Sequence, residues 1–198
     1  MNVKAQGLLN AAKWIEEQYG RDTLGEVVRA CSPAVRERYV SAIAINWHPV
    51  EELVEFLRAA ERLLGREDGR IAERIGAAGA RANMKGTLVR IAVYLARPEY
   101  LMQRIAGLWR QFNDQGEMLL VSMDEKHALI EVRGVTAADP LFCATLTGWC
   151  LETATRLGIV GTMVKHTHCR ARGDGRCLWD VRGSVDEAVA RDPARMPR

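Results

Sequence analysis

Two histidines and two cysteines lie within the twelve-residue sequence HTHCRARGDGRC, which begins at residue 166. Imidazole nitrogen and thiolate sulfur are preferred zinc ligands, and structural zinc sites usually hold four of them. His166 precedes Cys169 by three residues, and a tight turn at the intervening glycines would bring Cys169 back toward Cys177. Cys143, which precedes this stretch, would complete four ligands. A set with no open position is typical of a structural zinc site rather than a catalytic one.

The same cysteines have simpler interpretations. Cys143 and Cys150 are seven residues apart, a spacing equally natural for two small apolar side chains in a helical core. The eight-residue interval between Cys169 and Cys177 also lies outside the common short spacings of zinc fingers. Spacing alone therefore leaves a metal site and an ordinary hairpin both open.

Catalytic and disulfide chemistry are less well supported. A cysteine nucleophile needs a neighbouring base, and His166 or His168 could serve, but nothing marks an oxyanion hole or an orienting carboxylate. The five cysteines are an odd set, and Glu16 and Glu17 interrupt the N-terminus where a signal peptide keeps its apolar run. We therefore expect a cytoplasmic protein without a permanent disulfide, without catalytic residues and without enzymatic activity.

Composition is that of a globular domain. The chain has 198 residues, 48% of them hydrophobic, and a net charge of +3. This charge is too small and dispersed to predict nucleic-acid binding, and no apolar run approaches the roughly 20 residues that span a bilayer. We expect one domain over residues 1–185, mainly helical over 1–115, with a frayed tail at 186–198.

The first half of the chain is predicted to be helical from apolar residues at intervals of three and four. Thr23 and Glu26 have capping-box spacing, Pro33 can open a short helix, and Pro49 suits a first helical position. The helical segments are expected at 7–19, within 22–45, from Pro49 to Gly65, at 71–82, at 88–95 and at 98–112.

After residue 115 the apolar period changes to two. Residues 117–134 read as two strands joined by a turn at 124–126, and a helix is expected from the cap Asp139 through Pro140 to Gly158. Two more strands, IVGTMVKH and RCLWDVRG, flank the HTHCRARGDGRC loop. The order predicts an α+β fold, with a helical N-terminal half packed on a small antiparallel sheet.

The C-terminal run resembles a known family. Cys143 and Gly148 on one predicted helix, Gly158, and then HTHCRARGDGRCLWDV resemble the vinyl-reductase-type (4-vinyl reductase) small-molecule-binding domain of bacterial aromatic-sensing regulators and of a bacteriochlorophyll-synthesis protein. The stretches NWHPVEELVEFL, GAAGARANMKG and RPEYLMQRIAGLWRQFNDQG are similar to a paralogous family of uncharacterised bacterial proteins that end in such a domain. The resemblance implies a fold akin to heme-nitric-oxide-binding and TRAPP-like ligand domains.

The resemblance also implies a ligand set. In zinc-bearing members the ligands are a helical cysteine, an acidic residue, a cysteine three positions later and another eight further on. Here those positions hold Cys143, His166, Cys169 and Cys177. His166 departs from the usual carboxylate, although imidazole is a good zinc donor. His168 is the rival ligand because residues two apart on a strand share a face.

Other residues have both a functional and a structural interpretation. Trp47 with His48, Trp109 and Trp149 could line an aromatic pocket, or they could be plain core residues. Basic residues at 70, 74, 81, 85 and 90 could form a strip, although a solvated helix face is the default interpretation. Phosphate binding at GAAGARANMKG is rejected because no strand precedes its glycines.

Three functions follow, from different classes. The first hypothesis is a non-enzymatic sensory or signalling module with a structural zinc and a pocket for a hydrophobic or aromatic small molecule at the helix–sheet junction. The second is a dimeric scaffolding or adaptor protein of TRAPP-like type, and the third is a tetrapyrrole-handling protein. A homodimer and a partner protein are expected, with no membrane and no direct nucleic-acid contact. The cofactor-binding residues stay unknown at this point.

Overall fold

The computed structural model describes residues 1–198 except 66–67, 85–104, 125, 137–138, 158 and 186–198. The described helices are α1 (Gln6–Tyr19), α2 (Arg21–Arg29), α3 (Pro33–Ser41), α4 (Val50–Leu64), α5 (Ile71–Asn83), α8 (Ile105–Phe112) and α9 (Pro140–Arg156). The strands are β1 (Asn2–Lys4), β2 (Trp47–Pro49), β3 (Glu117–Met123), β4 (His127–Arg133), β5 (Ile159–His168) and β6 (Cys177–Val185). The predicted helix at 88–95, the start of the one at 98–112 and the tail lie outside the described residues.

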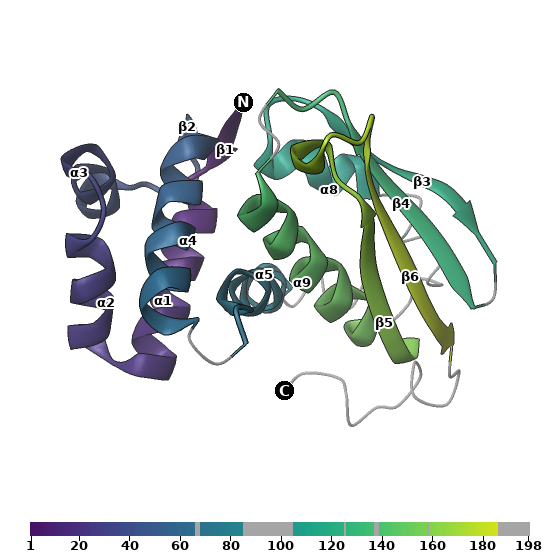
Figure 1. Ribbon diagram of the computed structural model, residues 1–198, viewed down its shortest axis with the longest axis horizontal. Coiled ribbons are helices and arrows are strands. Elements are labelled where there is room, and N and C mark those ends of the chain that lie inside the picture. The colour runs from purple at the N-terminus through teal and green to yellow at the C-terminus, as the bar shows by residue number, and fades with distance from the viewer. Residues whose placement is uncertain (66–67, 85–104, 125, 137–138, 158, 186–198) are drawn as a thin grey trace.

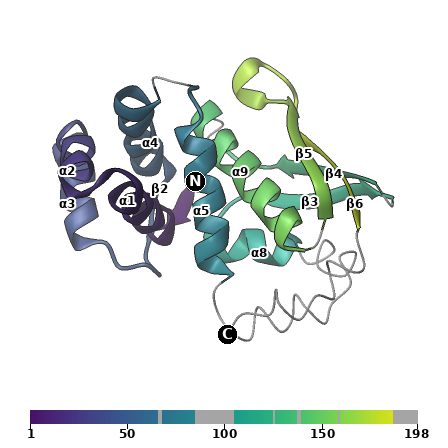
Figure 2. The ribbon, with the colours of Figure 1, turned by 90° about the horizontal axis from the view of Figure 1, so that it is seen from below.

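Two layers face each other across a pair of central helices (Figure 1). Helices α1 to α4 form one layer, and an antiparallel sheet of order β3-β4-β6-β5 forms the other. Helix α9 packs on the sheet and α5 lies between α9 and the helical layer, as the second view also shows (Figure 2). The predicted α+β architecture is confirmed. No helix in the described ranges is both long and apolar enough to cross a bilayer.

The helical layer follows the apolar pattern of the sequence. Helix α1 buries one face against α2, α4 and α5 and ends before Gly20, whose φ of 87° places it in the left-handed region that glycine tolerates. The predicted capping box at Thr23 is wrong. Helix α2 begins at Arg21, and the Thr23 hydroxyl donates to the Tyr19 carbonyl at 2.9 Å. The next helix is capped by Ser32, with Pro33 in its first turn as expected.

A two-stranded sheet was not predicted. Strands β1 and β2 pair antiparallel, with Val3 opposite His48. Pro49, expected as a first helical residue, is instead the last residue of β2 and the N-cap of α4. Three-residue strands are too short to show a period of two, so their pairing depends on tertiary contacts.

The second half matches the prediction closely. The 117–134 hairpin is present, and Asp139 caps α9 by accepting a hydrogen bond from the Leu141 N–H at 2.8 Å. Strand β5 extends two residues beyond the predicted run, to His168. Strands β5 and β6 pair antiparallel, and the loop of residues 169–176 that joins them lies beyond their shared end.

Helices α5 and α9 cross at backbone contact. A Cβ built on Gly148 would lie 1.8 Å from the carbonyl oxygen of Glu73, and one on Gly76 would lie 1.9 Å from that of Thr145. Only glycine fits at such separations. This crossing fixes where α9 lies between the helical layer and the sheet.

Candidate functional site

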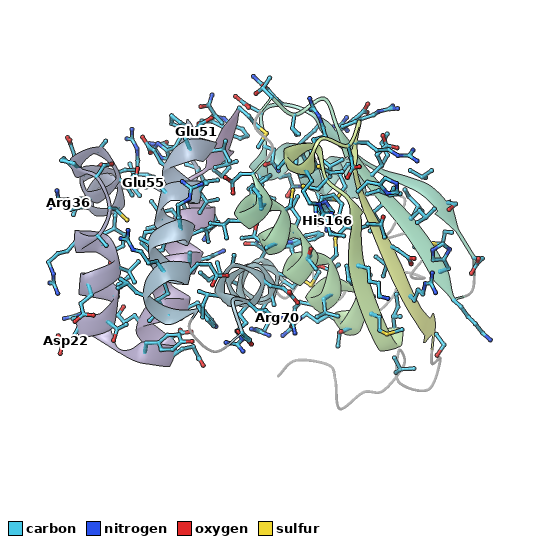
Figure 3. The ribbon with its side chains drawn as sticks, in the orientation of Figure 1. Asp22, Arg36, Glu51, Glu55, Arg70 and His166 are labelled. Atoms are coloured by element: carbon cyan, nitrogen blue, oxygen red, sulfur yellow. The ribbon has the colours of Figure 1, made fainter. Side chains whose placement is uncertain are left out.

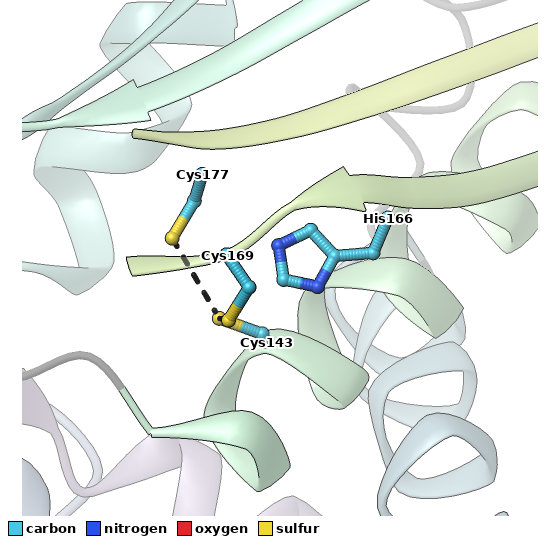
Figure 4. Close-up of side chains that lie close together, drawn as sticks. All are labelled: Cys143, His166, Cys169 and Cys177. Atoms are coloured by element: carbon cyan, nitrogen blue, oxygen red, sulfur yellow. Dashed lines mark hydrogen bonds between the residues drawn. The ribbon is translucent and has the colours of Figure 1, made fainter. Parts of the chain in front are cut away.

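Four potential metal ligands meet at the end of the sheet. Cys143 comes from the first turn of α9, His166 from β5, Cys169 from the loop after β5, and Cys177 from the start of β6. One ligand atom from each lies within 4.8 Å of the others (Figure 4). Among the described residues this is the group of histidine, cysteine and acidic side chains that could hold a metal ion. The four predicted ligands are therefore brought together.

The sulfur of Cys143 lies at nearly the same distance from the other two sulfurs as in a tetrahedral zinc centre. The Cys143 sulfur lies 4.0 Å from that of Cys177 and 4.0 Å from that of Cys169. A zinc ion with Zn–S bonds of about 2.3 Å would hold sulfurs roughly 3.8 Å apart. All three thiols are free and buried. Both separations are therefore close to the value that a shared zinc ion would impose.

The imidazole of His166 is held in place by the sheet. It extends from β5 toward α9 (Figure 3) and stacks on the indole of Trp179, with ring centroids 4.2 Å apart and an interplanar angle of 10°. Trp179 is fully buried, and its Nε1 donates to the Thr147 hydroxyl of α9 at 2.9 Å. The Nε2 of His166 is buried with no hydrogen-bond partner among the described residues, which suits a metal ligand.

Sequence reasoning missed Trp179 and Thr147. A signal was available, because Trp179 is two residues after Cys177 on a strand and Thr147 is four residues after Cys143 on a helix. Each therefore shares a face with a predicted ligand. Together they link the sheet to α9 beside the cluster.

The loop supplies the turn that the glycines predicted. A short 3₁₀ segment, Arg170–Arg172, ends at Gly173, whose φ is 95°. The Asp174 carboxylate then accepts a hydrogen bond from the Cys169 N–H at 2.6 Å, and the Arg170 N–H donates to the Cys177 sulfur at 3.4 Å. Backbone N–H groups near thiolate sulfur stabilise its negative charge.

His168 is separated from the cluster. The pairing of β5 with β6 shifts register between His166 and His168, so the two side chains do not share a face. His168 is exposed, and its Nδ1 contacts the Thr167 hydroxyl at 3.1 Å. The structure therefore places His166, and not His168, beside the thiols.

Electrostatics differ between the clustered and isolated cysteines. The Cys143 thiol is directed at the Cys177 sulfur, which lowers the pKa of Cys177 and raises that of Cys143, and His166 and the Arg170 N–H lower the pKa of Cys177 further. Burial without any such partner raises the pKa of Cys150 to about 12. Cys150 lies on α9 outside the cluster and behaves as a small apolar core residue.

A second feature is a cavity of about 130 Å³ between the two layers. Its wall comes from β1, α1, α4 and α5 on one side and from α8, β3 and α9 on the other. The apolar lining residues are Val3, Leu53, Ile75, Leu108, Trp109, Phe112, Met118, Phe142, Leu146 and Trp149. The cavity thus lies at the helix–sheet junction, where a pocket was expected.

Helix α9 contributes residues to both the cavity and the cysteine–histidine cluster. Phe142, Thr145, Leu146 and Trp149 follow intervals of three and four and line the cavity. Cys143, on the neighbouring stripe of the helix, faces the sheet and the cluster. Adjacent residues of one helix therefore border the cavity and the candidate metal centre.

The predicted aromatic residues divide into two groups. Trp109 and Trp149 line the cavity, and the Trp109 indole donates to the Gln115 carbonyl at 3.0 Å. Trp47 is exposed, and His48 is absent from the described wall of the cavity.

The basic residues on α5 and its N-terminal flank are paired with acids. Arg70 pairs with Glu73, Arg74 with Asp68, and Arg81 with Glu152. Positions 85 and 90 of the predicted strip lie outside the described residues. The described part of the strip is therefore a solvated, ion-paired face.

Comparison with solved structures identifies the fold. An H-NOX protein from Shewanella oneidensis in the Fe(II)NO state has a TM-score of 0.68 and 12% identity over 91% of this chain and 99% of that chain. A triple mutant of an H-NOX protein from the same organism, in the Fe(II) state, has a TM-score of 0.71 and 12% identity over 94% and 98%. A point mutant of an H-NOX protein from K. algicida, unliganded in the Fe(II) state, has a TM-score of 0.66 and 9% identity over 91% and 96%.

This chain has the fold of those H-NOX domains. No family model matches the sequence, and no curated protein matches it either. At 9% to 12% identity the likeness concerns the fold alone. The predicted likeness to the fold of heme-nitric-oxide-binding domains is confirmed, whereas the likeness to vinyl-reductase-type and TRAPP-like domains stays a prediction from the sequence.

The described wall of the cavity offers no histidine, cysteine or tyrosine for a heme iron. Iron in heme proteins is held by a histidine, cysteine, tyrosine or methionine side chain, and the described wall offers only Met118 from that set. The four histidines of the chain are at 48, 127, 166 and 168, and none of them is in the described wall. Residues 85–104, outside the described residues, contain Tyr94, Tyr100 and Met102 but neither histidine nor cysteine. A volume of about 130 Å³ is also far below that of a tetrapyrrole and suits a single ring.

Proposed function

We propose that the chain is a non-enzymatic sensory module that binds a small hydrophobic or aromatic molecule in this cavity. The observation that carries the proposal is the shared use of α9, which lines the cavity with Phe142 and Leu146 and presents Cys143 to the thiol cluster. A ligand that shifts α9 would also move Cys143 and so change the position of the cluster at the end of the sheet. A partner protein that binds the surface at this end of the sheet would then respond to the change.

The cluster is proposed to hold structural zinc. The fit rests on three buried sulfurs and the partnerless Nε2 of His166. Bound zinc would tie the first turn of α9 to β5 and β6 and leave no open coordination position. Three thiolates and one neutral imidazole carry one negative charge more than the ion, which the N–H of Arg170 at the Cys177 sulfur partly offsets.

Elemental analysis of freshly purified, reduced protein tests the metal. We expect about one zinc per chain, and we expect Cys169→Ser to lose the metal and lower thermal stability because structural zinc contributes folding energy. Cys150→Ser is the matched control, since it removes a buried thiol outside the cluster. Metal-free wild-type protein, or equal zinc content in both variants, would contradict the proposal.

Ligand binding is tested by blocking the cavity. Native mass spectrometry should show a small molecule retained by the expressed protein, or toluene should raise the melting temperature when added. Gly79 lines the cavity, and a Cβ there would meet no atom within 4 Å, so Gly79→Leu can extend into the space. We expect this variant to keep its metal and lose the toluene effect. An unchanged effect would place the binding site elsewhere.

A second candidate function, a dimeric scaffold, is favoured by an apolar ridge. The ridge consists of Val40, Ile43, Ile45 and Trp47, whose exposed fractions are 83%, 59%, 74% and 42%. Its backbone is fixed, because the carbonyls of residues 44 and 46 accept from the N–H groups at the start of α1. Clustered exposed apolar side chains are typical of interaction surfaces, and these four fall within eight consecutive positions of the chain.

The occupant of the ridge is proposed to be a second copy of the chain. Arg36 and Glu37 are exposed one turn before Val40, so both charge signs border the ridge. A two-fold contact can match such a rim to itself, whereas an anionic membrane favours an excess of positive charge. A standard interface uses about 20 to 30 residues a side, so α3 and its surroundings would contribute as well.

Sedimentation velocity over a concentration series tests this second candidate. We expect Ile45→Glu to shift the protein from dimer to monomer, and Met163→Glu to leave the dimer intact. Met163 is the matched control because it is an exposed apolar residue on β5, away from the ridge. A monomeric wild-type protein, or ridge-dependent flotation with vesicles that contain phosphatidylserine, would contradict a self-contact.

A further inference from the structure

One corner of the cavity is built from three primary amides. Gln6 and Asn10 lie one turn apart on α1, and Asn83 is the last residue of α5. Gln6 Nε2 donates to Asn10 Oδ1 at 2.8 Å, and Asn10 Nδ2 donates to Asn83 Oδ1 at 3.4 Å. A primary amide has two N–H donors and a carbonyl that accepts twice, so these two bonds leave donors and acceptors to spare.

The other polar side chains of the described wall do not form such a group of bonded amides. The Thr145 hydroxyl donates to the Phe142 carbonyl at 2.7 Å, and the Asn113 amide donates to the Trp109 carbonyl at 3.1 Å. The amide corner therefore gathers three of the four amide side chains of the described wall, and these three are bonded to one another.

No cation in the described wall is directed at the amide corner. Lys4 is the charged residue among the described lining residues, and its ammonium donates to the Ile45 carbonyl at 2.5 Å and lies 3.8 Å from the ring centroid of Trp47. Asn83 is also at the C-terminal end of α5, where exposed carbonyls carry partial negative charge. Gln6 is at the positive end of α1, but the N–H groups of residues 5 and 6 already donate to the carbonyls of residues 46 and 44. A carboxylate in this corner would lose water without gaining a positive partner.

We propose that the Gln6–Asn10–Asn83 corner selects an uncharged ligand with one end that both donates and accepts hydrogen bonds. The rest of the ligand is apolar and one ring in size, since a cavity of about 150 Å³ holds benzene. This inference rests on the proposed function, because it takes the cavity to be the ligand site. It makes Asn10, which bonds both other amides, a specificity-determining residue.

Three one-ring probes of similar size test how the polarity and charge of a ligand affect its binding. Toluene fills the apolar space, benzamide adds an uncharged donor and acceptor, and benzoate replaces that group with a negative charge. Their dissociation constants are measured by isothermal titration calorimetry on the full chain. We expect benzamide to bind at least about tenfold more tightly than benzoate, because an unpaired buried polar or charged group costs that much or more.

Variants of the corner assign the preference to its residues. Asn10→Leu should weaken benzamide about tenfold and leave toluene within about twofold, since only the amide contacts are lost. Asn10→Asp should create a preference for benzylamine, whose ammonium the new carboxylate would pair. Gln18→Leu is the matched control, because it removes an exposed amide from the same helix. Circular dichroism confirms that each variant is folded.

The outcomes distinguish this inference from the proposed function. Toluene binding with equal affinities for benzamide and benzoate would overturn the amide selection and leave the cavity as the ligand site. An equal loss of toluene and benzamide in Asn10→Leu would show a packing role and overturn it too. If none of the three probes binds, both the ligand site and its selectivity are wrong.

Discussion

The α5–α9 crossing and the cavity beside it use glycine in opposite ways. At the crossing, Gly76 and Gly148 allow backbone to touch backbone, with no space for a methyl group. One turn further along α5, Gly79 borders the cavity and a Cβ there would meet nothing within 4 Å. The same residue type therefore closes one part of the interface and leaves the next part open. The tight crossing fixes how closely α5 and α9 approach each other beside the cavity.

Gly148→Ala should disrupt the close contact between α5 and α9 and produce the largest loss of stability. The added methyl would overlap the Glu73 carbonyl oxygen, and backbone cannot rotate away as a side chain can. We expect the free energy of unfolding to fall by about 3 kcal/mol or more, at the upper end of overpacking effects. Urea denaturation followed by circular dichroism measures it. A loss below about 1 kcal/mol would show that the helices separate readily.

Local features could be predicted from the sequence because nearby residues determine them. The start of α9 is one example, since Asp139 and Pro140 specify a cap and a first turn whatever packs against them. The hairpin at 117–134 is another, because its two strands and turn are contiguous. The predicted cap at Thr23 was wrong because Gly20 ends one helix directly before the next begins at Arg21.

The candidate site was predictable only in part. Cysteine and histidine spacing, together with the family resemblance, pointed to Cys143, His166, Cys169 and Cys177, and these side chains do meet. The register shift that separates His168 has no local signal, because it depends on how β5 pairs with β6. The amide corner was missed for the same reason. Its members come from α1 and α5, which are distant in sequence.

Trp179→Phe weakens the contact between the sheet and α9, and its effect on the free energy of unfolding should be intermediate. A phenyl ring can still stack on His166, but the Thr147 hydroxyl loses its indole donor and the smaller ring leaves space. We expect a loss of about 1–2 kcal/mol with zinc content unchanged. Trp47→Phe, at an exposed position, is the control and should change stability far less. Loss of the metal from the Trp179 variant would show that stacking alone does not hold the imidazole.

Gly79→Ala tests the part of α5 that borders the cavity. It should change the free energy of unfolding least, and it should raise it. Glycine within a helix costs roughly 0.5–1 kcal/mol relative to alanine, and here the new methyl would enter empty space. Stability should therefore rise by about that amount, while toluene binds somewhat less well because the cavity shrinks. Gly76→Ala, three residues earlier on the same helix face, should instead destabilise the protein strongly. If both alanine variants lowered the free energy of unfolding alike, α5 would be closely packed along its whole length. The cavity would then be too small to admit a one-ring ligand.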